Sequence, residues 1–182
     1  MSDLTTTQRI DLLKRCVPEL FARPGHVLYV GANRLWGGGM QCVPELLKAG
    51  HEITLLEVWE KNAQSFKPGK EFEHIVIGDV TEIENVELSH DHYEAVVWWH
   101  GPEHIKATLL EPTLKRLELR ADLVVLGCPW GEYPQGAISG NPHDRHLAYL
   151  YPADFMLMGY QTETLGTIDT RGSHILAWKT KE

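Results

Sequence analysis

The stretch His26-Val27-Leu28-Tyr29-Val30, followed by a glycine-rich segment from Gly31 to Gly39, decides the fold of this chain. Five consecutive apolar or β-favouring residues are typical of a strand that is buried on both faces. Glycine lets the backbone turn sharply and approach a ligand closely. The segment reads GANRLWGGG, so the dinucleotide-binding spacing GxGxxG is absent. The stretch predicts the first strand of a parallel sheet with a ligand-binding turn at its carboxyl end.

Outward from this strand, strands and helices alternate along the chain. Further strands are expected at residues 52–57, 74–77, 93–98 and 123–127, and helices at 42–49, 58–66, 103–117 (with a restart at Pro112) and 152–158. Two last strands, 160–165 and 174–179, are joined by a turn at 170–172. This order predicts an α/β fold with a doubly wound, mostly parallel Rossmann-like sheet and a terminal antiparallel hairpin strand.

The first 24 residues predict a helix that covers one face of the sheet. Thr5 and Gln8 have the spacing of a capping box. A following apolar face contains Ile10, Leu13, Val17 and Leu20, and Pro18 is expected to kink or divide the helix. Without an internal repeat or a linker, we expect one domain over residues 1–182.

Composition limits the classes of partner. The 182 residues carry a net charge of −8 and 43% hydrophobic side chains, which argues for a packed core and against binding of nucleic acid. No apolar stretch approaches the roughly 20 residues that span a bilayer, so no membrane partner is expected. Three widely spaced cysteines (Cys16, Cys42 and Cys128) fit free thiols in the cytoplasm. The oligomeric state stays open.

Carboxylates follow the second and third predicted strands. Glu57 lies 20 residues after Gly37, where a ribose diol is held in doubly wound folds. Asp79 follows the third strand and could accept a hydrogen bond from an adenine amino group, or cap the next helix. Because parallel strands end at one edge of a sheet, both carboxylates are expected near the glycine turn.

The glycine turn, Glu57 and Gly78-Asp79 together resemble the first motifs of class I S-adenosylmethionine-dependent methyltransferases. The segments WWHGPEH (98–104), CPWG (128–131) and GNP (140–142), with His146, resemble a small branch of such proteins. The resemblance implies S-adenosylmethionine as cofactor. It implies a cofactor site made of Gly31, Ala32, Asn33, Gly37, Glu57, Asp79, Val80 and Trp98.

One position departs from the family pattern. An acidic residue usually stands two positions before the first glycine of the turn, whereas this chain has Tyr29. The amino-acid end of the cofactor then needs another partner, such as Asn33 or a backbone carbonyl.

The segment after the fourth strand is expected to face the reacting group. His100, Glu103 and His104 are the candidate catalytic residues, because an imidazole can accept a proton near neutral pH. His100 is the first choice, since it stands between two tryptophans and a Gly-Pro pair. The alternative is that the tryptophans pack in the core and that Glu103 and His104 open a helix.

The long loop from Pro129 to His146 is a candidate lid over the acceptor. The residues expected to bind the acceptor are Trp99, Trp130, Tyr133, Asn141 and His146. The ten histidines raise the question of a metal, but neither HExxH nor another compact ligand motif is present, so no metal site is expected.

These patterns favour a methyltransferase that acts on a small molecule or an unidentified acceptor. A non-catalytic nucleoside-binding protein of the same fold is the first alternative. An NAD(P)-dependent oxidoreductase or epimerase is less favoured, because GxGxxG and a Tyr-x-x-x-Lys pair are both absent from the sequence.

Overall fold

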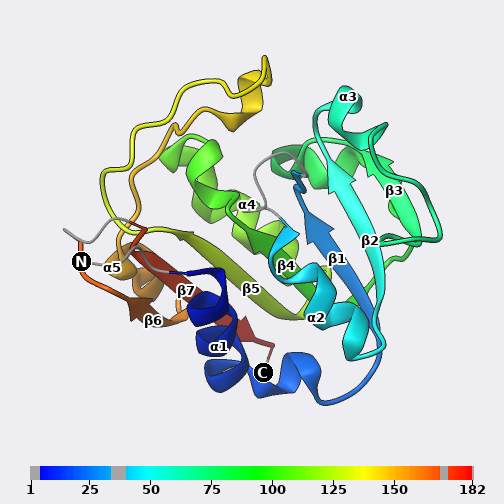
Figure 1. The fold of residues 1–182 in the computed structure, drawn as a ribbon, viewed down its shortest axis with the longest axis horizontal. Coiled ribbons are helices and arrows are strands. Elements are labelled where there is room, and N and C mark those ends of the chain that lie inside the picture. The colour runs from blue at the N-terminus through cyan, green and yellow to red at the C-terminus, as the bar shows by residue number, and fades with distance from the viewer. Residues whose placement is uncertain (1–4, 34–39, 169–171, 182) are drawn as a thin grey trace.

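The protein is described by a computed structural model for residues 5–33, 40–168 and 172–181. Seven strands in these ranges form one sheet in the order β3-β2-β1-β4-β5-β7-β6. Their bounds are β1 His26–Val30, β2 Glu52–Glu57, β3 His74–Ile77, β4 Tyr93–Trp99, β5 Ala121–Pro129, β6 Gln161–Leu165 and β7 His174–Thr180. Strand β7 is antiparallel to both β5 and β6, whereas the remaining pairs are parallel. The predicted fold class is confirmed (Figure 1).

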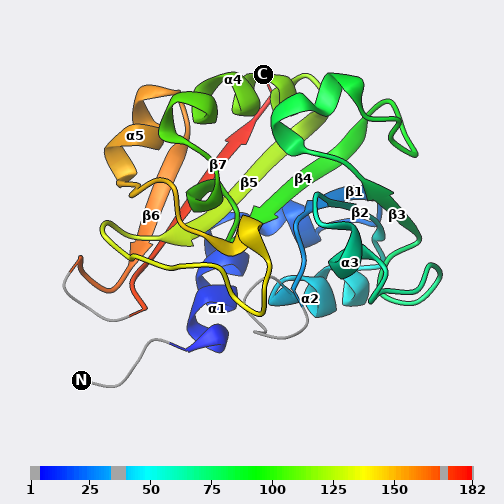
Figure 2. The same ribbon diagram turned by 90° about the horizontal axis from the view of Figure 1, so that it is seen from above.

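Helices cover both faces of the sheet (Figure 2). One face carries α1 (Thr6–Cys16), the 3₁₀ helix η1 (Pro18–Phe21), α2 (Val43–Lys48) and α3 (Glu60–Ala63). The other carries η3 (Val80–Asn85), α4 (Ala107–Glu118) and α5 (Pro152–Leu157). Each face has its own buried cluster, in which alternate strand residues meet the helices on that side.

The N-terminal segment folds as its sequence predicts. Thr5 caps α1 and forms a capping box with Gln8, in which each side chain meets the other residue's backbone. The helix ends at Cys16, and Pro18 begins η1, so the proline divides the segment into two helices. Leu13 of α1 and Leu20 of η1 are buried, as expected for a segment that covers one face of the sheet.

Two predicted helices differ from the structure. The helix expected at 58–66 is a single turn, α3, because the carboxylate of Glu57 holds the backbone N–H of Trp59 and delays the start. The helix expected at 103–117 is split into η4 (Pro102–His104) and α4, and α4 continues through Pro112. The predicted turn at 170–172 lies largely outside the described residues.

The sheet reverses its strand order between β1 and β4. Strand β1 continues through β2 to β3 on one side, and β4 continues through β5 on the other. Loops that leave neighbouring strands at such a point diverge, and the crevice between them is where ligands bind in this class of fold. Gly31 and His100 follow the two central strands at this crevice.

Candidate functional site

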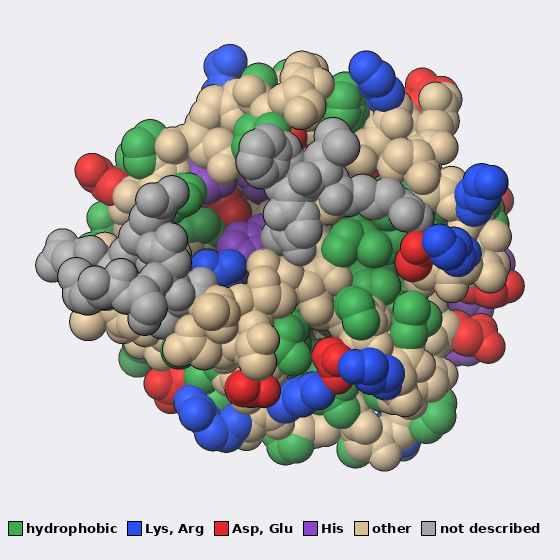
Figure 3. Space-filling model, viewed as in Figure 1, with side chains coloured by type: hydrophobic (Ala, Val, Ile, Leu, Met, Phe, Trp, Pro, Cys, Tyr) green, Lys and Arg blue, Asp and Glu red, His purple; other side chains and the backbone are tan. Residues whose placement is uncertain are grey.

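A cavity of about 530 Å³ opens at the carboxyl ends of the parallel strands. It is lined by the residues that follow β1, β2, β3 and β4, by the loop after β5 and by Arg9 from α1. Figure 3 shows a hollow on this side of the molecule with histidine, acidic and basic side chains inside it. The volume lies within the range of small-molecule and cofactor sites.

The first part of the glycine turn lines the cavity. Gly31 has φ +70° and donates its N–H to Leu56 O at 2.8 Å. A Cβ added there would meet no heavy atom of the described residues within 4 Å, so this part of the chain leaves space beside the backbone. Ala32 and Asn33 also line the cavity. The predicted contact at Gly37 lies outside the described residues.

Glu57 lies at the end of β2 and is 5% exposed. Its Oε2 accepts hydrogen bonds from Ala32 N at 3.2 Å and from Asn62 Nδ2 at 2.9 Å, and its Oε1 accepts one from Trp59 N at 2.9 Å. Burial raises the pKa of Glu57, and these bonds oppose the rise. The carboxylate is therefore fixed in one orientation at the cavity wall, with room on Oε1 for a second donor.

Asp79, Val80 and Trp98 line the same cavity. Asp79 caps η3: its Oδ1 accepts bonds from both the N–H and the hydroxyl of Thr81, each at 2.8 Å. The capping role considered from the sequence is confirmed. A ligand contact by the same carboxylate remains compatible with it, because a carboxylate has several acceptor positions.

Tyr29 points away from the cavity. It is fully buried in the core on the α1 side, beside Phe72 and Cys42, and burial raises its pKa well above the usual value. The position at which the family has an acidic residue thus carries a core side chain in this chain.

The two adjacent tryptophans of β4 face opposite sides of the sheet, because successive strand residues alternate. Trp98 lines the cavity, whereas Trp99 is fully buried in the core on the α1 side and donates from Nε1 to Gln41 Oε1 at 3.2 Å. Trp130 packs against the core on the α4 side and lies outside the cavity lining. Trp99 and Trp130, which the sequence proposed for acceptor binding, therefore pack against the core and not at the cavity wall.

His100 makes the sharp turn that leaves β4. Its φ is +53°, in the left-handed region that non-glycine residues rarely adopt, and its N–H donates to Gly127 O at 2.7 Å. Gly101 follows because a Cβ there would lie 1.8 Å from Trp98 Nε1. The WWHGP segment therefore folds as one unit, in which the indole of Trp98 occupies the space left by Gly101.

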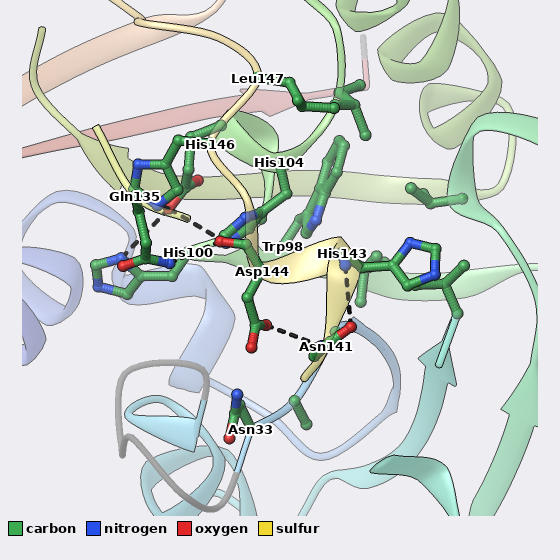
Figure 4. A pocket seen from close by; sticks show the side chains of 18 of the residues that line it. Asn33, Trp98, His100, His104, Gln135, Asn141, His143, Asp144, His146 and Leu147 are labelled. Atoms are coloured by element: carbon green, nitrogen blue, oxygen red, sulfur yellow. Dashed lines mark hydrogen bonds and ion pairs between the residues drawn. The ribbon is translucent and has the colours of Figure 1, made fainter. Parts of the chain in front are cut away.

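Glu103 lies at the centre of three imidazoles. Its Oε1 is 3.6 Å from His100 Nδ1, 3.9 Å from His104 Nε2 and 4.0 Å from His146 Nε2. Figure 4 shows the three rings gathered at one end of the pocket, with Asn33 apart from them. We refer to these four residues as the histidine cluster.

The electrostatics of the histidine cluster follow from its burial. Glu103 is 2% exposed; burial pushes the pKa of this carboxyl up, but the imidazole of His100 at 3.6 Å and the charge of His104 outweigh it and leave the pKa lowered. Burial also lowers the pKa of His146. The cluster thus combines an ionised carboxylate with a neutral imidazole.

The loop after β5 returns over the cavity and reaches the cluster. Tyr133, Asn141 and His146, the residues of this loop proposed to bind the acceptor, line the cavity. Asn141 is 4% exposed and organises the loop, since its side chain accepts from His143 N and donates to Asp144 Oδ1. The N–H groups of Leu147 and Ala148 donate to Glu103 O at 2.8 and 3.1 Å, which fixes the loop end against η4.

Arg9 and Asn62 are among the lining residues that the sequence did not indicate. Arg9 donates from one terminal nitrogen to Gly172 O at 2.8 Å, and the other lies 3.5 Å from His100 Nε2. Burial lowers the pKa of this guanidinium. Arg9 stands four residues before Leu13 and so shares the apolar face of the predicted covering helix. A charged residue on that buried face is the sequence feature that could have indicated a role in the site. Asn62, five residues after Glu57, donates a hydrogen bond to its carboxylate. No sequence pattern distinguishes this asparagine from a surface residue.

No family model matches the sequence, and no curated protein sequence matches it. Among solved structures, the chain is similar to the N-terminal domain of EvdMO1 with S-adenosylhomocysteine (SAH) and D-fucose, at 15% identity and a TM-score of 0.64, covering 100% of this chain and 85% of that one. It is also similar to SAH-bound magnesium protoporphyrin IX methyltransferase from Synechocystis PCC 6803, at 13% identity and a TM-score of 0.60, covering 100% and 90%.

A third similar structure, from Rhodobacter sphaeroides, is assigned provisionally to the Zn-dependent alcohol dehydrogenases; it has 10% identity and a TM-score of 0.63, with coverage of 94% and 89%. At such identities the likeness concerns the fold, and one fold carries different reactions. The chain has the fold shared by SAH-bound methyltransferase structures, with its cavity at the strand ends of that fold.

Proposed function

We propose that the protein is an S-adenosylmethionine-dependent methyltransferase. The observation that carries the proposal is Glu57, a buried and rigidly held carboxylate that lines the cavity beside the Gly31 turn. A fixed carboxylate can accept hydrogen bonds from both hydroxyls of a ribose, and an open glycine backbone leaves room for the amino-acid end of the cofactor.

The described residues fit the nucleoside part of this cofactor. Glu57 would hold the ribose hydroxyls, and Gly31 leaves space where any side chain would fill the cavity. Asp79, Val80 and Trp98 would surround the base. Asn33 and the backbone of the turn would hold the amino-acid end, because Tyr29 is turned into the core.

S-adenosylmethionine supplies an electrophilic methyl group on a sulfonium. Trp98 and the loop after β5 exclude water from the place where an acceptor would meet it. His100, supported by Glu103, is the group best placed to take the acceptor's proton, since its ring lines the cavity at the end of β4. His104 and His146, which also face Glu103, would orient the acceptor together with Tyr133 and Asn141.

The acceptor is proposed to be a small molecule. The loop after β5 covers the cavity and leaves a compartment of limited volume, and the net charge of −8 disfavours a nucleic acid. Among the described residues, no helix is long and apolar enough to cross a bilayer. We place the protein in the cytoplasm, because Cys16, Cys42 and Cys128 are free thiols.

Isothermal titration calorimetry with SAH and with NAD tests the cofactor. We expect SAH to bind with a stoichiometry of one and NAD not to bind. Tight binding of NAD without SAH would overturn the proposal in favour of an oxidoreductase. A screen of small acceptors with S-adenosylmethionine then separates an enzyme from a nucleoside-binding protein, because only the enzyme releases SAH in proportion to methylated product.

A further inference from the structure

The histidine cluster contains a buried carboxylate that lacks a complete set of partners. Glu103 Oε2 is fully shielded from solvent and has no hydrogen-bond partner in the described part of the chain. Its Oε1 faces His104 Nε2 and His146 Nε2 at about 4 Å, beyond hydrogen-bond distance. Burying an ionised carboxylate is costly unless a cation or donors compensate it.

The other nitrogen of each ring is already engaged by a backbone carbonyl. His146 Nδ1 lies 2.5 Å from Tyr133 O, and His104 Nδ1 lies 3.3 Å from Arg145 O. A carbonyl only accepts, so both rings carry a proton on Nδ1. In the neutral form, each Nε2 then directs a lone pair toward Glu103. This is the arrangement in which metal-binding histidines are oriented by their surroundings.

One ligand atom from each of Glu103, His104 and His146 lies within 4.8 Å of the other two, and Glu103 Oε1 is 3.9 and 4.0 Å from the two Nε2 atoms. Zinc binds nitrogen and carboxylate oxygen at about 2.0–2.2 Å, so two ligands of a tetrahedral site stand about 3.3–3.6 Å apart. A pair at the 4.8 Å limit would close by about 1.2–1.5 Å on binding. His146 lies outside the helices and strands. No hydrogen bonds of regular secondary structure therefore oppose this movement of its backbone.

From this geometry we propose that Glu103, His104 and His146 bind a divalent transition-metal ion of the zinc class. Two imidazoles and one carboxylate are a ligand set that such ions favour over calcium or magnesium. The sequence predicted no metal, because one ligand comes from the loop more than 40 residues after the other two.

Three protein ligands leave at least one coordination position, and all three residues line the cavity. The open position suits an oxygen of the acceptor. Arg9 lines the same cavity, so its guanidinium would attract a negatively charged acceptor together with the metal ion. On the basis of the proposed methyltransferase function, the acceptor is then a small molecule with a hydroxyl or carboxylate oxygen that binds the metal. Binding of the metal itself does not depend on that function.

The test is titration of the chelator-treated, full-length protein with Zn²⁺, and with Co²⁺ followed by visible absorption. We expect one tight site per chain and the intense d–d bands of low-coordinate cobalt. His104→Ala and His146→Ala should each weaken this site at least about 100-fold, because each removes a direct ligand. His143→Ala is the matched control: this histidine lines the same cavity from the same loop but lies outside the cluster, and its variant should bind as the wild type does.

Circular dichroism and a thermal melt of every variant show whether it is folded. Absence of a tight site in the wild type would overturn the proposal, as would tight binding retained in folded His104→Ala and His146→Ala variants. Both results would leave the three side chains as a proton-holding cluster. SAH binding, measured in parallel on metal-free protein, separates this outcome from failure of the proposed function, because Gly31 and Glu57 take no part in the metal site.

Discussion

The two ends of the cavity are built in different ways. At the strand-end side (Gly31, Glu57 and Asp79), each group ends a strand or follows one within two residues. Each carboxylate is held by a group two residues further on, Trp59 or Thr81, and Glu57 is also held by Ala32 N, just after the adjacent strand β1. The histidine cluster joins η4 to a loop more than 40 residues away, through backbone bonds to Glu103 O. The first end depends on local geometry, whereas the second depends on the course of a long loop.

The largest effect is expected from Gly31→Val. A valine at φ +70° is strained and its side chain would fill the open space at the turn, so SAH affinity should fall more than about 100-fold, or about 2.7 kcal/mol. Calorimetry measures the loss. Gly69→Val is the matched control, because Gly69 has φ +76°, equally open space and no place in the cavity. Equal SAH affinity in both variants would show that the turn is not a ligand site.

Replacing His100 tests the reacting end. His100→Asn keeps a residue that tolerates a left-handed backbone but that takes up no proton near pH 7. We expect turnover of an acceptor found by screening to fall about 100-fold, with SAH affinity changed less than about threefold. His92→Asn, at an exposed histidine, is the control. A parallel loss of stability, SAH affinity and turnover would assign His100 to packing alone.

Glu57→Gln should weaken SAH binding by about 1.5–3 kcal/mol, the range for hydrogen bonds to a charged group. Burial raises the pKa of Glu57, so wild-type affinity should fall as the pH drops through that raised pKa and the carboxylate is protonated. The variant should lack this dependence. Glu52→Gln, at the exposed start of the same strand, should retain it. Unchanged affinity in Glu57→Gln would remove Glu57 from the ribose site.

The smallest effect concerns His174, which packs behind the histidine cluster against the rings of His100 and Trp99. Its ring is fully buried, both nitrogens lack partners among the described residues, and burial lowers its pKa well below 6.5. The unfolded chain therefore binds a proton that the folded chain excludes, and the free energy of unfolding falls as the pH drops below about 6.5, by at most about 1.4 kcal/mol per pH unit.

His174→Phe should remove this part of the pH dependence. Urea unfolding at pH 7.5, 6.0 and 5.0 measures it, with His92→Gln as the control at an exposed ring. If wild type and His174→Phe lose the same free energy between pH 7.5 and 5.0, then protonation of His174 does not oppose folding.

Local pattern predicted much of the strand-end side. The run of apolar residues in β1 and the carboxylate that ends β2 follow from residue type and strand period, and Glu57 lines the cavity as that pattern indicates. Strand alternation also places Trp98 and Trp99 on opposite faces of the sheet. Only Trp98 therefore lines the cavity, and Trp99 packs in the core on the α1 side. Helix 58–66 was also predicted too long, because Glu57 binds the backbone that would have opened it.

The amino-acid sequence alone predicted the α/β class, a mostly parallel sheet, the capped and divided N-terminal helix and the carboxylate at the end of β2. These depend on periodicity and on contacts between near neighbours in the chain. Only the tertiary structure decided that Tyr29 faces the core, that Arg9 enters the cavity and that His146 meets Glu103. Each of these depends on how segments distant in sequence pack together, which residue type and local spacing do not specify.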